Sequence, residues 1–518
     1  MAKLIAYTNY AEAQAHCSAR KLWELFDGNK KSFNIGQECV DRHASDPERL
    51  AVIVVGADGS EERISFRQLS ILSNQFANRL VEKGIKSGDR VAVMLEPSLA
   101  FYVSIFGAMK SGAVAVPLFT LFGHDGIRLR VDDCQPKVLV TNPEKADVAA
   151  GIAGVDLLIV DADFGKRLRD YPDSFAVATA ADDLALFQYT SGTTRELPAA
   201  VKHTHRALVT LMLAALYGTG IRPGDRFFCP SSPAWGHGLW HGTLAPLALG
   251  VTIGSFRGKF DPERLLKALQ EHGFNNISAA ATHYRMMRTS GAAPKYRYVI
   301  DKVSFTGEPM DGETEQFVRR TFGLPVCSMY GTTEIGVILV NYPGATDFEV
   351  KPGSLGKPVP GVKVEVHDPE GKRCPPGATG ELMVWRHGEW LPTKDLGQAD
   401  DDGYFYHGGR ADDVIISAGW TMSAVEIENA ILKHPDVLEA AAIGVPDKVR
   451  GQVVKAFVVA KRSGNDALTK EIQELVRSKL SQHEYPRHVA FVPELPKTPA
   501  GKVHRKALRE RELLQAGA

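Results

Sequence analysis

The chain has 518 residues, 61 basic and 61 acidic side chains, and a hydrophobic content of 44% that is ordinary for a globular protein. Its length predicts more than one domain, because single cores stop growing at roughly 250–300 residues. The even charge balance argues against a nucleic-acid partner, since such binders carry a basic excess. No apolar run reaches the ~18 residues that span a bilayer, and the first residues lack a secretory pattern. We therefore expect neither a membrane nor a nucleic-acid partner.

The cysteines are far apart in the sequence, and no two of them form a C-x-x-C pair. Closely spaced pairs are typical of zinc sites and disulfide scaffolds, so neither is expected. The pattern favours reduced thiols and a cytoplasmic location. We expect small core residues at all six positions: Cys17, Cys39, Cys134, Cys229, Cys327 and Cys374.

Residues 63–165 alternate between helical and strand-like patterns. In 63–80 the apolar residues recur at helical spacing, at Leu69, Leu72, Phe76 and Leu80. A second helix is expected near 98–111. Short apolar runs, typical of strands covered on both faces, occupy 91–95, 113–118, 138–140 and 157–160. This alternation predicts a layered α/β sheet.

The middle and the end of the chain differ from this region in composition and in the elements that they predict. A helix is expected after Asp261, with Pro262 at its first position and Gly273 just past its end. Residues 351–408 are rich in glycine and proline and indicate a β subdomain. A capping box formed by Ser423 and Glu426 predicts a helix start. Strands are expected at 438–445 and 453–460, and another helix near 470–482.

These elements predict an α/β fold with two domains. The large N-terminal domain, 1–411, has layered α/β sheets and a β subdomain, and the small α+β domain spans 412–518. One stretch of the large domain stands out because hydroxyls surround a glycine: Thr190, Ser191, Gly192, Thr193 and Thr194. Backbone amides and hydroxyls in such a turn can wrap anionic oxygens. It is not a Walker loop, because G-x-x-x-x-G-K-[ST] is absent from the sequence.

Further motifs follow this phosphate cradle in a fixed order: SFTGEPM (304–310), SMYGTTEIG (328–336), TKDLG (393–397), GGRADD (408–413) and PKTPAGKVHR (496–505). Over residues 60–508 the chain resembles the adenylate-forming superfamily of acyl-CoA synthetases, luciferases and peptide-synthetase adenylation domains. The stretches SPAWGHGLW and GRADDVIISAGW look most like those of medium-chain and aryl acyl-CoA synthetases. The resemblance implies an AMP-forming carboxylic acid–CoA ligase that uses ATP, Mg²⁺ and coenzyme A in fatty or aromatic acid metabolism.

The resemblance also assigns roles to residues. Lys502 is the catalytic lysine that bridges the α-phosphate and the carboxylate, Glu334 holds Mg²⁺, and Thr333 donates to the α-phosphate. ATP contacts are implied for the cradle and for Gly307, Glu308, Pro309, Tyr330, Gly331, Thr332, Asp395 and Arg410. The small carboxylic acid substrate is expected beside Trp235, His237, Gly238 and Tyr284. For His237, gating of that pocket and simple burial both stay open.

Members of this superfamily rotate the small domain between two half-reactions, so the C-terminal domain is expected to be mobile. Asp412 then serves as the hinge, and Ala418, Gly419 and Trp420 line the tunnel for coenzyme A. Lys502 ends a P-x-x-x-x-G-K pattern that resembles an acetylation target, which implies a lysine acetyltransferase as a partner. Relatives range from monomers to homo-oligomers, so the oligomeric state stays open.

The chain departs from the superfamily's pattern at two places. The cradle usually continues T-G-x-P-K-G, but here Ala199 stands at the lysine position, and Arg195 or Lys202 could replace the missing cation. The usual T-G-D has Lys394 in place of its glycine. Two alternatives to the ligase therefore remain. One is an adenylation enzyme that loads a carrier protein on another chain, and the other is a catalytically impaired nucleotide sensor.

Overall fold

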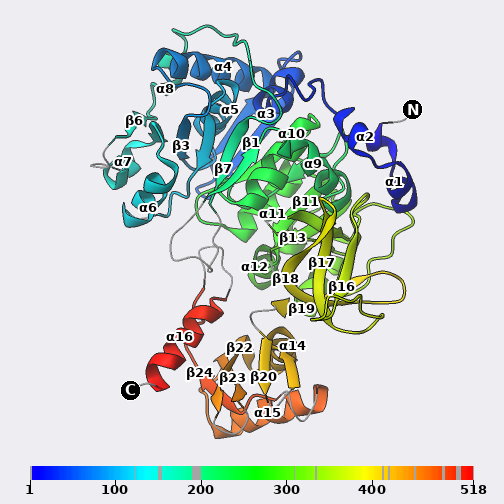
Figure 1. Ribbon diagram of the computed structural model, residues 1–518. Coiled ribbons are helices and arrows are strands. Elements are labelled where there is room, and N and C mark those ends of the chain that lie inside the picture. The colour runs from blue at the N-terminus through cyan, green and yellow to red at the C-terminus, as the bar shows by residue number, and fades with distance from the viewer. Residues whose placement is uncertain are drawn as a thin grey trace. The chain divides into compact units, whose positions relative to one another are not determined.

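The computed structural model describes residues 3–122, 124–149, 154–189, 200–307, 310–332, 335–410, 414–417, 420–447, 451–480, 485–497 and 503–516. The chain divides into two compact units, one with the described residues up to Val362 and one with those from Lys363 onward. The predicted mixed α/β architecture is confirmed (Figure 1). The predicted domain boundary at 411/412 stays a prediction.

The first sheet of the first unit has the strand order β6-β5-β3-β4-β7-β8, and only β7 and β8 pair antiparallel. Its strands are β3 (Arg90–Met94), β4 (Val114–Pro117), β5 (Val138–Thr141), β6 (Asp156–Ile159), β7 (Leu184–Gln188) and β8 (Val201–Thr204). The four strands predicted between 91 and 160 are thus confirmed to within about one residue. Helices near this sheet (Figure 1) are α4 (Phe66–Glu82), α5 (Leu99–Lys110), α6 (His124–Cys134), α7 (Pro143–Ala149) and α8 (Phe164–Leu168).

Helix α4 forms as its periodicity predicts. The hydroxyl of Ser65 accepts a hydrogen bond from the amide of Gln68 and so caps the first turn. Leu69, Phe76 and Leu80 are fully buried on one face, and Leu72 is half-buried beside them.

A buried ion pair fastens the chain that precedes α4 to both α4 and α5. Lys110 is fully buried, and its Nζ donates to Asp41 Oδ1 at 2.5 Å, to Ser73 Oγ at 2.8 Å and to Asn74 Oδ1 at 2.8 Å. Asp41 follows helix α3 (Ile35–Cys39), whereas Ser73 and Asn74 belong to α4. A buried ammonium with three acceptors is fully satisfied, so this network fixes three segments against one another.

The other strands of the first unit follow the order β15-β14-β13-β12-β11-β9-β10-β1-β2. Those from β13 to β1 are parallel. The flanking pairs β1–β2, β13–β14 and β14–β15 are antiparallel. Their bounds are β1 (Leu50–Gly56), β2 (Glu61–Ser65), β9 (Arg226–Phe228), β10 (Thr252–Arg257), β11 (Asn276–Ala280), β12 (Lys302–Thr306), β13 (Cys327–Thr332), β14 (Gly336–Val340) and β15 (Ser354–Pro358). The carboxyl ends of the parallel strands share one edge, where ligands bind in open α/β sheets.

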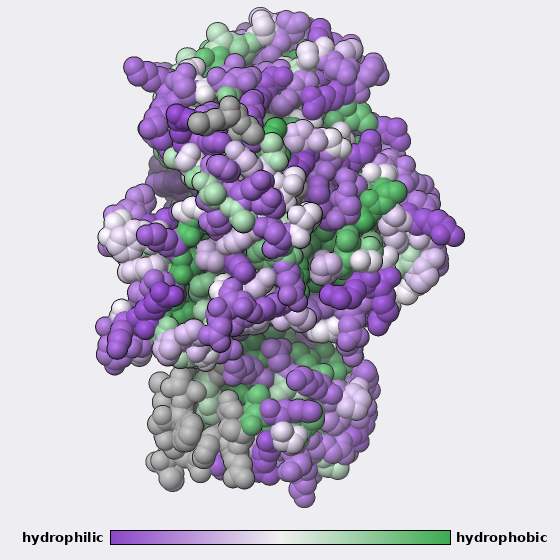
Figure 2. Space-filling model, turned by 90° about the vertical axis from the view of Figure 1, so that its right-hand side faces the viewer, coloured by the Kyte–Doolittle hydropathy of each residue, from purple (hydrophilic) through white to green (hydrophobic). Residues whose placement is uncertain are grey.

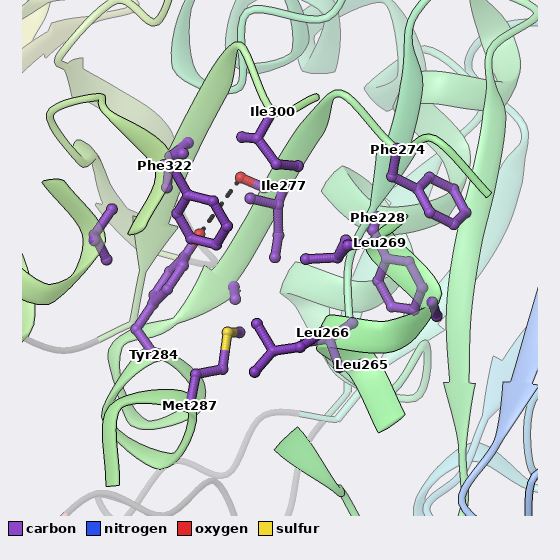
Figure 3. Close-up of a cluster of buried hydrophobic side chains, with 14 of the residues drawn as sticks. Phe228, Leu265, Leu266, Leu269, Phe274, Ile277, Tyr284, Met287, Ile300 and Phe322 are labelled. Atoms are coloured by element: carbon purple, nitrogen blue, oxygen red, sulfur yellow. Dashed lines mark hydrogen bonds between the residues drawn. The ribbon is translucent and has the colours of Figure 1, made fainter. Parts of the chain in front are cut away.

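Helix α11 (Pro262–Glu271) confirms the predicted start and end signals. The Asp261 side chain accepts from the amide of Arg264, Pro262 takes the first position, and Gly273 adopts a φ of +59° after the last turn. Figure 3 shows its leucines inside a cluster of buried side chains from this part of the first unit. The labelled members are Phe228, Leu265, Leu266, Leu269, Phe274, Ile277, Tyr284, Met287, Ile300 and Phe322.

The remaining α-helices in the described part of the first unit are α1 (Tyr10–His16), α2 (Ala19–Trp23), α9 (Ala207–Leu213), α10 (Ala245–Ala248), α12 (Ala281–Ser290) and α13 (Gly312–Phe322). Two π-helical segments, η3 (Ala214–Gly218) and η4 (His237–Leu244), adjoin α9 and α10. Such wide turns are frequent at functional sites.

The described strands of the second unit pair in the orders β16-β17-β18-β19, β20-β21 and β22-β23-β24. Its elements are β16 (Val364–His367), β17 (Gly380–Arg386), β18 (Glu389–Ala399), β19 (Phe405–Arg410), β20 (Val414–Ser417), β21 (Trp420–Ser423), α14 (Ala424–Ile431), β22 (Val437–Asp447), β23 (Gly451–Ala460), α15 (Asp466–Lys479), β24 (His488–Phe491) and α16 (Arg505–Ala516). Helix α14 begins where the capping box predicts, although the side chain of Ser423 lies outside the described residues. The helix predicted at 470–482 begins earlier, because Asn465 caps it by accepting from the amide of Leu468.

Side chains on the β22–β23 sheet alternate between two cores. Ala440 and Ala442 belong to a cluster with residues of α14 and α15. Ala441 and Ile443, which point to the other face, pack with Leu495 and with Leu508 of α16. The sheet is therefore covered on both faces, with period 2 along its strands.

The six cysteines are free thiols. Four are buried as expected, but Cys17 and Cys374 are half-buried, so the prediction of core positions is wrong for those two. No helix in the described ranges combines the length and the apolarity that a membrane span needs. On the face that Figure 2 presents, hydrophilic side chains predominate and hydrophobic ones form small areas between them.

Candidate active site

Two of the predicted ATP-binding motifs meet at the carboxyl edge of the parallel strands in the first unit. Strands β12 and β13 are parallel neighbours, with Ser304 opposite Cys327. Gly307 directly follows β12, and Tyr330, Gly331 and Thr332 end β13. Gly307 has a φ of +99°, in the left-handed region where a residue without a side chain is favoured.

Gly331 is required by the hairpin that β13 forms with β14. The register of the two strands shifts between Tyr330 and Gly331. A Cβ atom at position 331 would lie only 2.1 Å from the carbonyl oxygen of Gly336. Thr333 and Glu334 lie outside the described residues, so their roles toward the α-phosphate and Mg²⁺ stay predictions.

Trp235 connects the predicted acid pocket to the predicted adenine segment. A Cβ at Gly307 would lie 3.3 Å from the ring of Trp235, so the indole packs directly on that glycine. The ring also stands edge-on to the imidazole of His237, with centroids 5.8 Å apart. Glu308 and Pro309, which complete the adenine motif, lie outside the described residues.

His237 opens the segment η4 and is held by two hydroxyls. Its exposed fraction is 4%, its Nδ1 lies 3.0 Å from Ser231 Oγ, and its Nε2 lies 2.9 Å from Ser278 Oγ. Burial lowers its pKa well below 6.5, and the nearby His241 and His283 add to the shift. The imidazole is therefore neutral at pH 7. A gating movement would have to break both hydrogen bonds, whereas structural burial needs neither to break.

Gly238 and Tyr284 have clear packing roles. A Cβ at Gly238 would lie 2.2 Å from the carbonyl oxygen of Ser232, so the tight turn into η4 requires a glycine. Tyr284 is fully buried within the core cluster of Figure 3. Its hydroxyl donates to the carbonyl of Ser304 at 2.8 Å and also lies 3.5 Å from the carbonyl of Ile277, the contact that the figure draws as a dashed line. Contact of either residue with an acid substrate stays a prediction.

Gln188 is a candidate that the sequence analysis missed. It ends β7 just before the hydroxyl cradle, and its exposed fraction is 1%. Its Oε1 accepts from Trp240 Nε1 at 2.9 Å, which fastens the end of β7 to η4. Within the described ranges, its Nε2 has no hydrogen-bond partner. A buried amide donor of this kind is suited to a ligand or an ordered water. The available signal was a single polar residue at the end of the apolar run LALFQ.

The cradle itself, Thr190–Thr194, lies outside the described residues, as do Arg195 and Ala199. Lys202, the other candidate for the missing cation, is on β8, and its Nζ lies 5.2 Å from the ring centroid of Phe187 on β7. The choice between Arg195 and Lys202 therefore stays open.

In the second unit, Asp395 on β18 stands directly opposite Arg410 on β19. Asp395 is 6% exposed, its amide donates to Thr393 Oγ1 at 3.1 Å, and His407 Nε2 lies 3.8 Å from its Oδ1. Trp420 begins β21, but the side chains of Trp420 and Arg410 lie outside the described residues. The same is true of all of Asp412, Ala418, Gly419 and Lys502, whose roles stay predictions.

The unusual Lys394 adopts a left-handed backbone conformation, with a φ of +62°. This explains why a glycine suits the position, because a Cβ there costs roughly 1–2 kcal/mol. We expect Lys394→Gly to raise the free energy of unfolding by about 0.5–1 kcal/mol, after the extra backbone entropy of glycine in the unfolded chain. Urea unfolding measures the change. Lys394→Ala keeps the Cβ and serves as the control, and an equal gain in both variants would contradict backbone strain as the cause.

Among the described residues, Glu61, Glu271 and His272 place oxygen and nitrogen atoms close enough to hold a metal ion. The guanidinium of Arg264 lies among them, 3.1 Å from Glu61 Oε1 and 3.5 Å from Glu271 Oε2. Both carboxylates are thus already paired with a cation, and Glu271 pairs also with Lys267 at 3.3 Å. This cluster is an ion-pair network rather than a metal centre.

Buried histidines predict a pH dependence of stability for the first unit. Burial lowers the pKa values of His203, His205, His241 and His283 from 6.5 to about 4. Between those pH values the unfolded chain binds more protons than the folded one, so acid favours unfolding. We expect the urea midpoint to be steady above pH 6.5 and to fall continuously toward pH 4. A midpoint that stayed level from pH 6.5 to 5 would contradict neutral histidines in the folded unit.

Comparisons with known proteins identify the family of the chain. Residues 40–389 match the family of AMP-binding enzymes, and residues 426–502 match the AMP-binding enzyme C-terminal domain. An acetyl-coenzyme A synthetase of Bacillus subtilis (strain 168) is 31% identical, over 98% of this chain and 96% of its own length.

Solved structures show the same similarity. An acyl-CoA synthetase of Brucella canis is 30% identical with a TM-score of 0.76, covering 98% of this chain and 100% of that chain. The anthranilate CoA ligase AuaEII, solved in complex with anthranoyl-AMP, is 25% identical with a TM-score of 0.85, covering 97% and 100%. The chain therefore belongs to the AMP-binding enzymes and is an adenylate-forming acid–thiol ligase of the acyl-CoA synthetase type.

Proposed function

We propose that the enzyme joins an aryl or medium-chain aliphatic carboxylic acid to coenzyme A. In the first half-reaction a carboxylate oxygen attacks the α-phosphate of ATP, which forms the acyl-adenylate and releases pyrophosphate. In the second half-reaction the thiol of coenzyme A loses its proton, attacks the acyl carbon and expels AMP. The observation that carries the proposal is the meeting of Trp235, Gly307 and the Tyr330–Thr332 segment at one edge of parallel strands.

We assign a separate role in the first half-reaction to each of the following residues. Lys502 supplies a positive charge between the α-phosphate and the carboxylate, where negative charge collects in the transition state. Thr333 donates to the α-phosphate, and the oxygen ligand Glu334 suits Mg²⁺, whose charge neutralises the triphosphate. Asp395 accepts from the ribose hydroxyls, with Arg410 beside it. The cross-strand register of Asp395 and Arg410 supports their joint role.

The environment of the acid pocket supports an uncharged acyl group. The flat, half-buried indole of Trp235 offers an apolar wall, and His237 is neutral, so it provides no cation for a second carboxylate. The related anthranilate CoA ligase acts on an aryl acid. An aromatic acyl group could stack on the indole of Trp235 and bury apolar surface of both rings.

In the second half-reaction the small domain binds coenzyme A. We place the domain boundary at 411/412, with Asp412 as the hinge. Ala418, Gly419 and Trp420 line the pantetheine tunnel, where the thin backbone of a glycine lets the thiol pass. An acceptor on a carrier protein is the alternative within the superfamily.

The proposal is tested by pyrophosphate release with Mg-ATP and a panel of benzoates, phenylacetates and C2–C12 fatty acids, with and without coenzyme A. We expect release with one acid class and stimulation by coenzyme A. Release that coenzyme A leaves unchanged would favour the carrier-loading enzyme. Binding of ATP without release for any acid of the panel would favour the nucleotide sensor.

Acetylation of Lys502 is expected to stop only the first half-reaction. The modification removes the charge that adenylate formation needs, but the thioester step does not use that charge. Protein acetylated at Lys502 should lose pyrophosphate release and should still convert preformed acyl-adenylate and coenzyme A to thioester. Adenylation at the normal rate by the acetylated protein would contradict this regulation.

A further inference from the structure

The chain on both sides of the segment that carries Lys502 is fastened to the second unit. Lys497 and Val503 form an isolated antiparallel bridge, and the amide of His504 donates to the carbonyl of Pro496 at 2.8 Å. Leu495 before the segment and Leu508 after it are buried in the same cluster against β22 and β23. The two described ends of the segment are therefore held side by side.

An ion pair then fixes the chain just after the bridge. Arg505, the first residue of α16, donates from Nε to Glu428 Oε1 at 3.0 Å and from Nη2 to Glu428 Oε2 at 2.5 Å. The two side chains are 19% and 9% exposed. Two parallel hydrogen bonds between planar groups fix orientation as well as distance. This pair therefore restrains the start of α16 more tightly than a single contact could.

Glu428 is itself rigidly held. It belongs to α14, and its Oε1 also accepts from the amide of Ala442 on β22 at 2.8 Å. Strand β22 is the outer strand of its three-stranded sheet. Because α14 and α16 pack on opposite faces of that sheet, Glu428 joins both layers at the edge of β22. Any displacement of Arg505 would have to move this whole arrangement.

We propose that Glu428 and Arg505 are positioning residues that hold Lys502, three residues before Arg505, in register for adenylate formation. This inference rests on the proposed function, because it needs Lys502 to be the cation of the first half-reaction. A displacement of ~1 Å in a reacting group can cost about 10²-fold in rate. The proposed effect of the pair on the reaction passes through the lysine.

The test uses Glu428→Gln and Arg505→Gln in the full chain. The matched control is Glu512→Gln, because Glu512 lies on the same helix and pairs with Lys455 at 2.6 Å with similar burial, 19% for Lys455 and 16% for Glu512. Amide hydrogen exchange of the peptide covering 496–504 is the first readout. We expect exchange about threefold faster or more in the two test variants, from local opening, and no change in the control.

The second readout separates the half-reactions, with the panel acid that gives the highest rate. ATP–pyrophosphate exchange should fall about 10- to 100-fold in the test variants, while thioester formation from preformed acyl-adenylate and coenzyme A stays within about twofold. Arg505→Lys keeps the charge but cannot form the two parallel hydrogen bonds to Glu428. Its rate of ATP–pyrophosphate exchange should therefore lie between those of wild type and Arg505→Gln.

Parallel loss of both half-reactions would show a general structural role and overturn the proposal. Unchanged hydrogen exchange or unchanged pyrophosphate exchange in Arg505→Gln would also overturn it. Lys502→Ala in the same assay tests the catalytic role of Lys502 separately from the positioning role of Glu428 and Arg505. Full activity of Lys502→Ala would refute the catalytic role of the lysine, whereas an impaired Lys502→Ala beside a normal Arg505→Gln would refute the positioning pair alone.

Discussion

Replacement of Lys502 by alanine is expected to lower the rate of acyl-adenylate formation by about 10²–10³-fold, the usual loss when one preorganised donor to a transition-state charge is removed. The acid and ATP should still bind, because the contacts that we propose for adenine and ribose do not involve Lys502. The loss should therefore appear in kcat rather than in KM. Single-turnover formation of adenylate with Mg-ATP measures it directly.

Lys497→Ala is the matched control for this experiment. Lys497 lies five residues earlier in the same motif and makes an exposed ion pair with Glu439 at 2.8 Å, in which the two side chains are 44% and 40% exposed. Exposed pairs of this kind contribute about 0–1 kcal/mol, so the variant should keep its activity. Equal losses in Lys497→Ala and Lys502→Ala would contradict a specific catalytic role for Lys502.

A large loss in the free energy of unfolding is expected from Lys110→Met. Methionine fills a similar volume but leaves Asp41, Ser73 and Asn74 without the ammonium that now binds all three. Removal of one partner from a buried pair costs about 3–5 kcal/mol. We expect a loss of about 3 kcal/mol in the free energy of unfolding, because Asp41 is 25% exposed and can recover part of its hydration. The urea transition of the first unit measures the change.

Lys83→Met is the control, since Lys83 pairs with Asp156 at 2.6 Å but the two side chains are 35% and 53% exposed. Its effect should stay within about 1 kcal/mol. The double variant Lys110→Met with Asp41→Asn should recover part of the lost stability, because no charge is then left unpaired. A Lys110→Met protein as stable as Lys83→Met would contradict the account of a buried, fully satisfied network.

Periodicity and capping signals predicted most of the secondary structure because both depend on neighbouring residues. The apolar face of α4 and the cap of α11 are local features, so the sequence alone could show them. The apolar pattern predicts a helix start near 470, whereas α15 begins at Asp466, because the side chain of Asn465 caps its first turn.

Features that depend on distant contacts could not be predicted in the same way. Glu428 and Arg505 are 77 residues apart in the sequence, and only the folded second unit brings them together. Gln188 reaches Trp240 across 52 residues, and no local pattern marks either partner. The half-burial of Cys17 and Cys374 likewise depends on neighbours that the sequence does not specify.

The candidate site was predicted from motif order, and the structure adds reasons for some of its residues. Gly331 and Gly238 are required by close backbone contacts that a motif alone does not explain. The strained φ of Lys394 shows why glycine suits that position. For His237 the sequence left gating and burial equally open, and its two hydroxyl partners could only come from the fold.

The central claim is that the enzyme forms an acyl-CoA through an acyl-adenylate. The most direct measurement is mass-spectrometric detection of products from Mg-ATP, the acid panel and coenzyme A, compared with the same mixture without coenzyme A. We predict equal amounts of acyl-CoA and AMP with coenzyme A, and enzyme-bound acyl-adenylate with released pyrophosphate but no acyl-CoA without it. ADP and phosphate in place of AMP and pyrophosphate, or AMP without any acyl-CoA, would contradict the account.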